Sequence, residues 1–254
     1  MSALAIWWFG IFLEGVILVQ AMRSKAISKY PVFFAYIAFV MASEVSRFIV
    51  HERAAGIYVV WWWSTEFIGV LLGYWVLLDI LEKVLSPYTG AKKFARNAGL
   101  LILFVVLSFT TFEWLAEKHS SLALTSVEVE RNLRSAEAAL LCVLLLLVVA
   151  YYGVSIGRNL RGILLGYGMY IALDVMVNAT RSFLGHSFQG VFSIIRSYSY
   201  LAALIIWTYA LWSYVPVSTA AQAPRLEADY QSLASATREK LGAMRSYLGR
   251  SGRR

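Results

Sequence analysis

Charge is scarce in this chain, and that scarcity indicates its class. Only 15% of the 254 residues are Asp, Glu, Lys or Arg, whereas soluble domains typically carry about 25%. Hydrophobic residues make up 59% of the chain, so too little polar surface is available to face water. This composition excludes an ordinary soluble domain and predicts an all-α protein that crosses the lipid bilayer several times.

Cysteine is nearly absent as well. The single Cys142 stands in a leucine-rich run, and no second cysteine exists with which it could form an intramolecular disulfide. We interpret it as a small buried apolar residue. The histidines, His51, His119 and His186, have no other metal-ligating residue three or four positions away, so we predict neither a metal nor a cofactor.

Sequence signatures of catalysis are also missing. The chain contains no H-E-x-x-H, G-x-S-x-G or Walker pattern, and no histidine falls inside an apolar stretch, where a seven-helix zinc hydrolase would need one. The last apolar stretch has no lysine for a retinal Schiff base, and the switch motifs of animal heptahelical receptors are absent. These absences disfavour an enzyme, and no motif for binding nucleic acid is present either.

Long apolar stretches are what the sequence does contain. Each is long enough to cross a hydrocarbon core of about 30 Å as a helix. Seven of them fall near residues 3–22, 31–50, 57–80, 98–116, 132–154, 162–184 and 190–214. No basic segment or cleavage site precedes the first stretch, so we expect it to remain in the membrane. We therefore predict a seven-helix transmembrane domain over residues 1–215 and a tail over residues 216–254.

Lysine and arginine concentrate in alternate loops. Basic residues cluster in the segments 23–29, 83–96 and 158–161 and again in the tail, whereas the other loops contain few. Because basic loops stay in the cytoplasm, this pattern predicts an N-terminus outside and a C-terminus in the cytoplasm. The formal net charge of +8 reflects the same bias and gives no support for a nucleic-acid partner.

The tail has a helical pattern of its own. Leucine, tyrosine and methionine recur at helical spacing between Leu226 and Leu248, and the remaining positions are largely basic. Two interpretations stay open. The segment is either a solvated amphipathic helix, or a helix that lies on the anionic inner leaflet or binds a protein partner in the cytoplasm or membrane.

Ionisable residues inside the predicted spans are the strongest functional signal. Each costs about 2.5–3.5 kcal/mol at the centre of a membrane helix, so these side chains must face one another or water inside the bundle. Helical spacing places Tyr170, Asp174, Asn178 and Arg181 on one stripe. The full candidate set is Glu14, Glu44, Arg47, Glu66, Arg134, Glu137, Tyr170, Asp174, Asn178, Arg181 and Arg196.

Two hypotheses compete for this set, and they are compatible. Acids and bases nearly neutralise each other, which favours a structural network of ion pairs between helices. The alternative is a pocket open to the extracytoplasmic side that binds a small zwitterionic or anionic ligand. In the third span, Glu66 shares a face with Gly69 and Gly73, a spacing typical of close helix packing, so we expect Glu66 to face neighbouring helices.

Two stretches carry a resemblance. The segments "SKYPVFFAYIAF" and "GRNLRGILLGYGMYIAL" are similar to those of a family of uncharacterised seven-helix bacterial membrane proteins, notably from acidobacteria. The similarity covers about residues 1–215. It implies a multi-pass protein of the bacterial inner membrane and no defined activity.

Taken together, these features predict a sensor or receptor-like membrane protein, whose ligand enters from outside and whose inner loops and tail transmit the signal. A transporter of a small solute or of protons is the first alternative, with Glu66 and Asp174 as relay carboxylates. A structural or accessory subunit of a larger membrane complex is the second.

Overall fold

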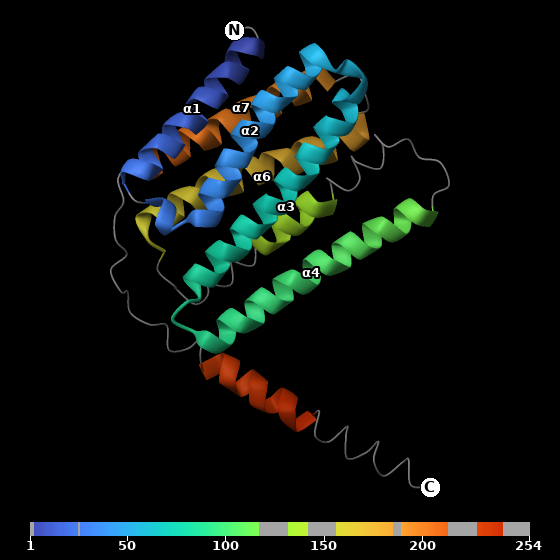
Figure 1. Ribbon diagram of the computed structural model, residues 1–254. Helices are drawn as coiled ribbons and strands as arrows, with labels where there is room; N and C mark the ends of the chain where they lie inside the picture. Colours follow the sequence, from blue (N-terminus) through green and yellow to red (C-terminus); the bar gives the residue numbers. More distant parts are fainter. Residues whose placement is uncertain are drawn as a thin grey trace.

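The computed structural model describes residues 3–24, 26–116, 132–141, 156–184, 189–212 and 228–240. Within these ranges every regular element is a helix and no β-strand occurs, which confirms the predicted all-α class (Figure 1). The elements are α1 (Ala3–Arg23), η1 (Ala26–Ser28), α2 (Pro31–Arg53), η2 (Ala55–Ile57), α3 (Tyr58–Val84), α4 (Thr89–Ala116), α6 (Arg158–Leu184) and α7 (Gln189–Ala210). Residues 132–141 and 228–240 are also helical.

The membrane character of the chain follows from the length and composition of its helices. Within the described ranges, three segments are long and apolar enough to cross a bilayer: Leu4–Arg23, Pro31–Arg53 and Arg158–Val177. The chain is therefore a helical membrane protein. The predicted count of seven spans and their orientation stay predictions, and residues 142–154 of the fifth predicted span, Cys142 included, lie outside the described part.

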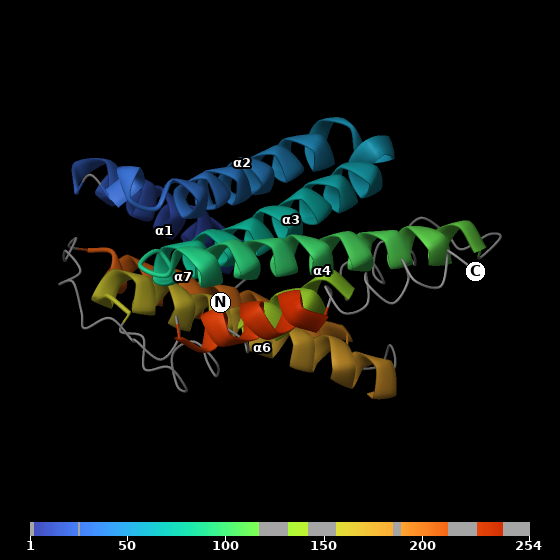
Figure 2. The same ribbon diagram turned by 90° about the horizontal axis from the view of Figure 1, so that it is seen from below.

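The helices form two groups with α1 between them. Figure 2 shows α2 and α3 on one side of the bundle and α6 and α7 on the other. Helix α1 packs against both α2 and α7, and so connects the two groups. The pairs α1–α2, α2–α3, α3–α4 and α6–α7 are each joined by a short connection and pack side by side. This arrangement brings residues far apart in the sequence to the centre of the bundle.

Helix α4 begins earlier than its apolar stretch predicted. It starts at Thr89 rather than near residue 98, because residues 89–97 contain alanine, lysine and arginine, which favour helix. Lys92 of this first part lies 3.4 Å from the Glu82 carboxylate at the end of α3. Farther along, the Tyr74 hydroxyl donates to the Gly99 carbonyl oxygen at 2.7 Å, which fixes α4 against α3.

Glycines set the closest helix contacts. A Cβ atom at Gly73 would collide with the Tyr167 hydroxyl and the Glu137 carboxylate, whereas one at Gly69 would make only ordinary contact. The close packing predicted for α3 therefore centres on Gly73. A second pair, Gly162 and Gly166, lets α7 approach α6 in the same way, and sequence analysis missed it although the G-x-x-x-G spacing is visible.

The helical segment 228–240 lies beside the start of α4 (Figures 1 and 2). The Tyr230 ring sits directly against Gly90, so closely that a Cβ atom there would collide with it. Leu233, from the same predicted apolar stripe, is 67% exposed. The helix predicted for the tail is thus present where the chain is described, and Tyr230 packs against the membrane domain. The predicted domain boundary near residue 215 lies outside the described residues.

Candidate functional site

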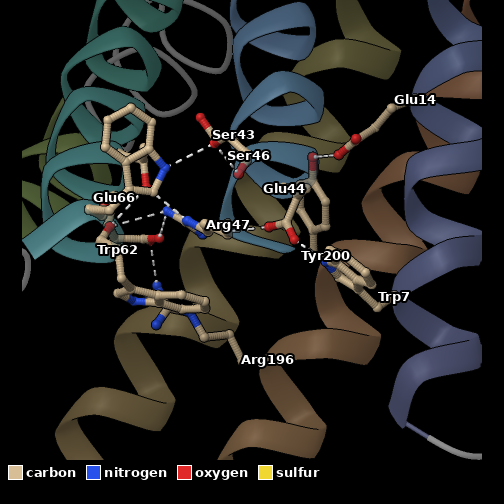
Figure 3. A network of polar contacts seen from close by, with 12 residues as sticks. Trp7, Glu14, Ser43, Glu44, Ser46, Arg47, Trp62, Glu66, Arg196 and Tyr200 are labelled. Carbon is tan, nitrogen blue, oxygen red and sulfur yellow. Dashed lines mark hydrogen bonds and ion pairs between the residues drawn. The ribbon is translucent and has the colours of Figure 1, made fainter. Parts of the chain in front are cut away.

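Arg47 joins α2 to α3 near the end of the bundle where these two helices are connected. Its Nε donates to Thr65 Oγ1 at 2.8 Å, and its Nη2 donates to Glu66 Oε2 at 3.0 Å. The Nη1 lies 3.5 Å from Glu44 Oε1, one turn earlier on α2, so the guanidinium extends between two carboxylates (Figure 3). The Trp62 ring covers it, with the guanidinium carbon 4.2 Å from the ring centroid.

Glu66 is shared by guanidinium groups from separate helices. Besides Arg47, its carboxylate accepts a hydrogen bond from Arg196 Nη2 of α7, with 3.0 Å between Nη2 and Oε1. Arg134, in the segment 132–141, places its Nη2 3.9 Å from the same Oε1. Several cations therefore surround one acid, and these contacts connect α2, α7 and the segment 132–141 to α3.

A second, deeper cluster surrounds Arg134. Its Nη1 donates to Glu137 Oε2 at 2.9 Å, one turn along the same segment, and its Nε lies 3.6 Å from Asp174 Oδ2 of α6. The Tyr170 ring packs on the guanidinium. Arg134, Glu137 and Asp174 are each at most 3% exposed, so the charges rely on one another rather than on water. Asp174 also faces Arg196, whose Nε is 3.1 Å from Oδ1.

The α1 side of the site contains a second partner of Glu44 and one further acid, Glu14. Glu44 accepts a hydrogen bond from the Trp7 indole. Glu14 accepts a hydrogen bond from the Tyr200 hydroxyl of α7, with 2.6 Å between the two oxygens (Figure 3). Tyr200 in turn contacts the Tyr170 ring, with centroids 5.5 Å apart. A chain of polar and aromatic contacts thus runs from α1 through α7 to α6.

A cavity of about 820 Å³ opens beside these groups. Known ligand pockets measure about 300–1,000 Å³, so its size suits a small molecule. The side chains that line it come from α1, α2, α3, α6, α7 and the segment 132–141. Its charged or hydrogen-bonding members include Glu44, Arg47, Glu66, Arg134, Tyr170, Arg196 and Tyr200, and the rim carries His51, Glu52 and Tyr58.

Buried aromatic rings close the bundle on the far side of the cavity. Tyr74, Tyr167 and Trp207 are each 0% exposed. The Trp207 indole donates to the Ile163 carbonyl oxygen at 3.0 Å, which fixes the ring in place. Its centroid is 5.7 Å from that of Tyr167, which lies a further 5.7 Å from the ring of Tyr36. These three side chains, the aromatic plug, therefore lie next to the cavity, because Tyr36 both packs on Tyr167 and lines the cavity.

The structure brings most of the predicted residues together. Those whose side chains line the cavity are Glu44, Arg47, Glu66, Arg134, Tyr170 and Arg196. Glu137 and Asp174 lie behind the cavity wall and pair with Arg134 and Arg196 of that wall. Glu14 contacts the wall through Tyr200. Asn178 and Arg181 belong to α6, and their side chains are outside the described part.

Sequence analysis missed several lining residues. Trp7, which binds Glu44, stands seven residues before Glu14 and so faces the same side of α1. Thr65 precedes Glu66 directly, and its hydroxyl orients Arg47. Tyr36 stands eleven residues before Arg47, again on the same face of α2. Trp7 and Tyr36 could have been identified from the sequence, because each lies at helical spacing from an ionisable residue already in the candidate set.

Comparison of the chain with models of protein families, with curated protein sequences and with solved structures found no match.

Proposed function

We propose that the protein is a receptor-like sensor of the bacterial inner membrane, with seven spans, its N-terminus outside and its C-terminus in the cytoplasm. The cavity would face the extracytoplasmic side and bind a small zwitterionic or anionic ligand. The observation that carries this proposal is the convergence of Arg47, Arg134 and Arg196, from separate parts of the fold, beside one cavity.

The exposure of individual side chains supports this ligand class. The Arg196 side chain is 35% exposed, so an anionic group in the cavity can reach its guanidinium without breaking the bundle. The Glu44 side chain is 24% exposed and can accept a hydrogen bond from a ligand ammonium group. The aromatic rings of Trp62 and Tyr58 line the same cavity and suit an amine group or an apolar part of the ligand.

The aromatic plug supports a sensor over an open pathway. Because Tyr74, Tyr167 and Trp207 are fully buried, a ligand in the cavity would act by shifting helices rather than by crossing the protein. The inner connections and the tail offer surfaces for an output partner. Tyr230 of the tail rests on Gly90 at the start of α4, so movement of α3 and α4 would reach the tail directly.

A thermal-shift screen tests the proposal. Amino acids, betaines and dicarboxylates are added to the purified protein in nanodiscs, and unfolding is followed by tryptophan fluorescence. A ligand at 100 times its Kd stabilises the folded state by about 2.7 kcal/mol. The shift should disappear in Arg196→Gln and persist in Arg96→Gln, because Arg96 pairs with Glu82 away from the cavity. No shift with any member of these classes would argue against the proposal.

Transport is the alternative that the carboxylates of the site favour, since Glu66 lines the cavity and contacts several cations. Proteoliposomes containing the protein separate the two functions. Solute or proton flux that is abolished by Glu66→Gln would support a transporter and overturn the sensor. If other membrane proteins co-purify with this chain through its lipid-facing surface, and the chain shows neither ligand binding nor flux, that result would instead support an accessory subunit.

A further inference from the structure

Glu14 differs from the other acids of the site in what surrounds it. The Glu14 residue is 1% exposed, and no guanidinium or ammonium group among the described residues lies within ion-pair distance of its carboxyl group. Oε1 accepts the Tyr200 hydrogen bond, whereas Oε2 is buried without a hydrogen-bond partner. Among the described acids of the site, Glu14 is the one for which no ion pair with a described cation is found.

An ionised carboxylate in this setting is costly. Even with partial relaxation, burying an unpaired charge costs several kcal/mol, and one phenol hydrogen bond offsets only a part of that. Glu44 on α2 is close enough to repel a negative charge on Glu14, and its own charge is balanced by Arg47. Among the described residues of α7, Tyr200 contacts Glu14 through its hydroxyl group, and the Tyr170 hydroxyl of α6 and the Tyr36 hydroxyl of α2 stand beyond it. None of these hydroxyl groups supplies a positive charge.

We propose that Glu14 is a proton-binding site that is loaded from the cavity through the Tyr200 hydroxyl group. Tyr200 lines the cavity on one side and touches Glu14 with its hydroxyl group. A proton from cavity water binds the Tyr200 oxygen while the original hydroxyl proton passes to Glu14 Oε1. One O–H bond forms at each oxygen and one breaks at Tyr200, which leaves a neutral phenol and a neutral carboxylic acid.

The site couples protonation to the contact between α1 and α7. The Tyr200–Glu14 hydrogen bond joins residues 186 positions apart in the sequence. A phenol donates more strongly to a carboxylate than to a neutral acid, so release of the proton would tighten this contact and pull on the cavity wall. Proton binding at Glu14 needs only water in the cavity and does not depend on which ligand the cavity binds.

Infrared difference spectroscopy tests the proposal. The full-length protein in nanodiscs should show the carbonyl band of a protonated carboxylic acid that shifts in D₂O and is lost as the pH is raised. The band should be absent in Glu14→Gln. It should persist in the control Glu44→Gln, because Glu44 is paired with Arg47. In Tyr200→Phe the band should move to higher frequency, because its hydrogen bond is gone, and its deuterium exchange should slow.

A chemical probe covers the case in which Glu14→Gln fails to fold. Dicyclohexylcarbodiimide enters apolar sites and reacts with protonated carboxyl groups, so wild-type protein should carry the adduct at Glu14, mapped by mass spectrometry, and should lose it at high pH. A folded Glu14→Gln variant with an unchanged carbonyl band would overturn the proposal. If that variant does not fold, the absence of a pH-dependent adduct at Glu14 would overturn it instead. Protection of Glu14 by Na⁺ at constant pH would overturn it in favour of a metal-cation site.

Discussion

Arg196 of α7 donates from Nη2 to Oε1 of Glu66 on α3 at 3.0 Å, and so links two helices whose residues stand 130 positions apart. The same guanidinium reaches Asp174 on α6 through its Nε. One side chain therefore holds three helices together at the cavity wall. It is also the most exposed of the three described arginines of the wall, so in the proposed function it would both bind the ligand and stabilise the bundle.

A double-mutant cycle should measure this link. Glu66→Gln leaves several arginines facing a neutral amide, and we expect it to lower the free energy of unfolding by about 3 kcal/mol. Arg196→Gln should cost less, because Glu66 keeps Arg47. The double variant should be more stable than the sum of the two changes predicts, with a coupling of about 0.5–3 kcal/mol in denaturant titrations. Strictly additive losses would show that the pair contributes nothing.

The loss of stability on substitution should differ between two glutamates, Glu137 and Glu82, because they differ in burial. Glu137 is 0% exposed and pairs with Arg134, so Glu137→Gln should cost about 3–5 kcal/mol because it leaves a buried guanidinium without its closest partner. Glu82, at the α3–α4 end, has a 28% exposed side chain, and Glu82→Gln should cost less than about 1 kcal/mol. Thermal unfolding followed by tryptophan fluorescence compares them. Equal losses would contradict the importance assigned to the deep cluster.

Two glycines offer a matched test of close packing. Gly73→Ala should destabilise the bundle by about 1–3 kcal/mol, because the new methyl group collides with Tyr167 and Glu137. Gly15→Ala, inside α1, meets nothing within 4 Å and should gain up to about 1 kcal/mol of helix propensity. The difference in unfolding midpoint between these variants is the measurement. A neutral Gly73→Ala would mean that α3 and α6 are less closely packed than described.

Arg47 should not be replaceable by lysine. Its guanidinium binds Thr65 through Nε and Glu66 through Nη2, and an ammonium group cannot make both contacts in this planar arrangement. We expect Arg47→Lys to lose about 1–3 kcal/mol of stability, even though the charge is kept. Arg53→Lys at the exposed end of α2 serves as the control and should be neutral. A lysine variant as stable as the wild type would show that only the charge matters.

Local spacing accounts for part of the site. Glu44 with Arg47 and Arg134 with Glu137 are each three residues apart, so a helix alone places them on one face, and both pairs form. Composition likewise predicted the helical membrane class. By contrast, Glu14 entered the candidate set as a member of a pocket or ion-pair network, and its partner is a tyrosine on α7. Helix spacing within α1 carries no information about that choice.

The sequence by itself determined that this is a helical membrane protein and which faces of its helices are polar, because hydropathy and the 3.6-residue period act locally. Only the tertiary structure decided which arginine meets which carboxylate. The pairing of Arg196 with Glu66, and the position of Glu14 away from any described cation, depend on how far α7 slides along α3 and α1. Close contacts at Gly162 and Gly166 hold α7 against α6, and the close contact at Gly73 holds α3 against α6. These contacts appear only once the helices are packed together.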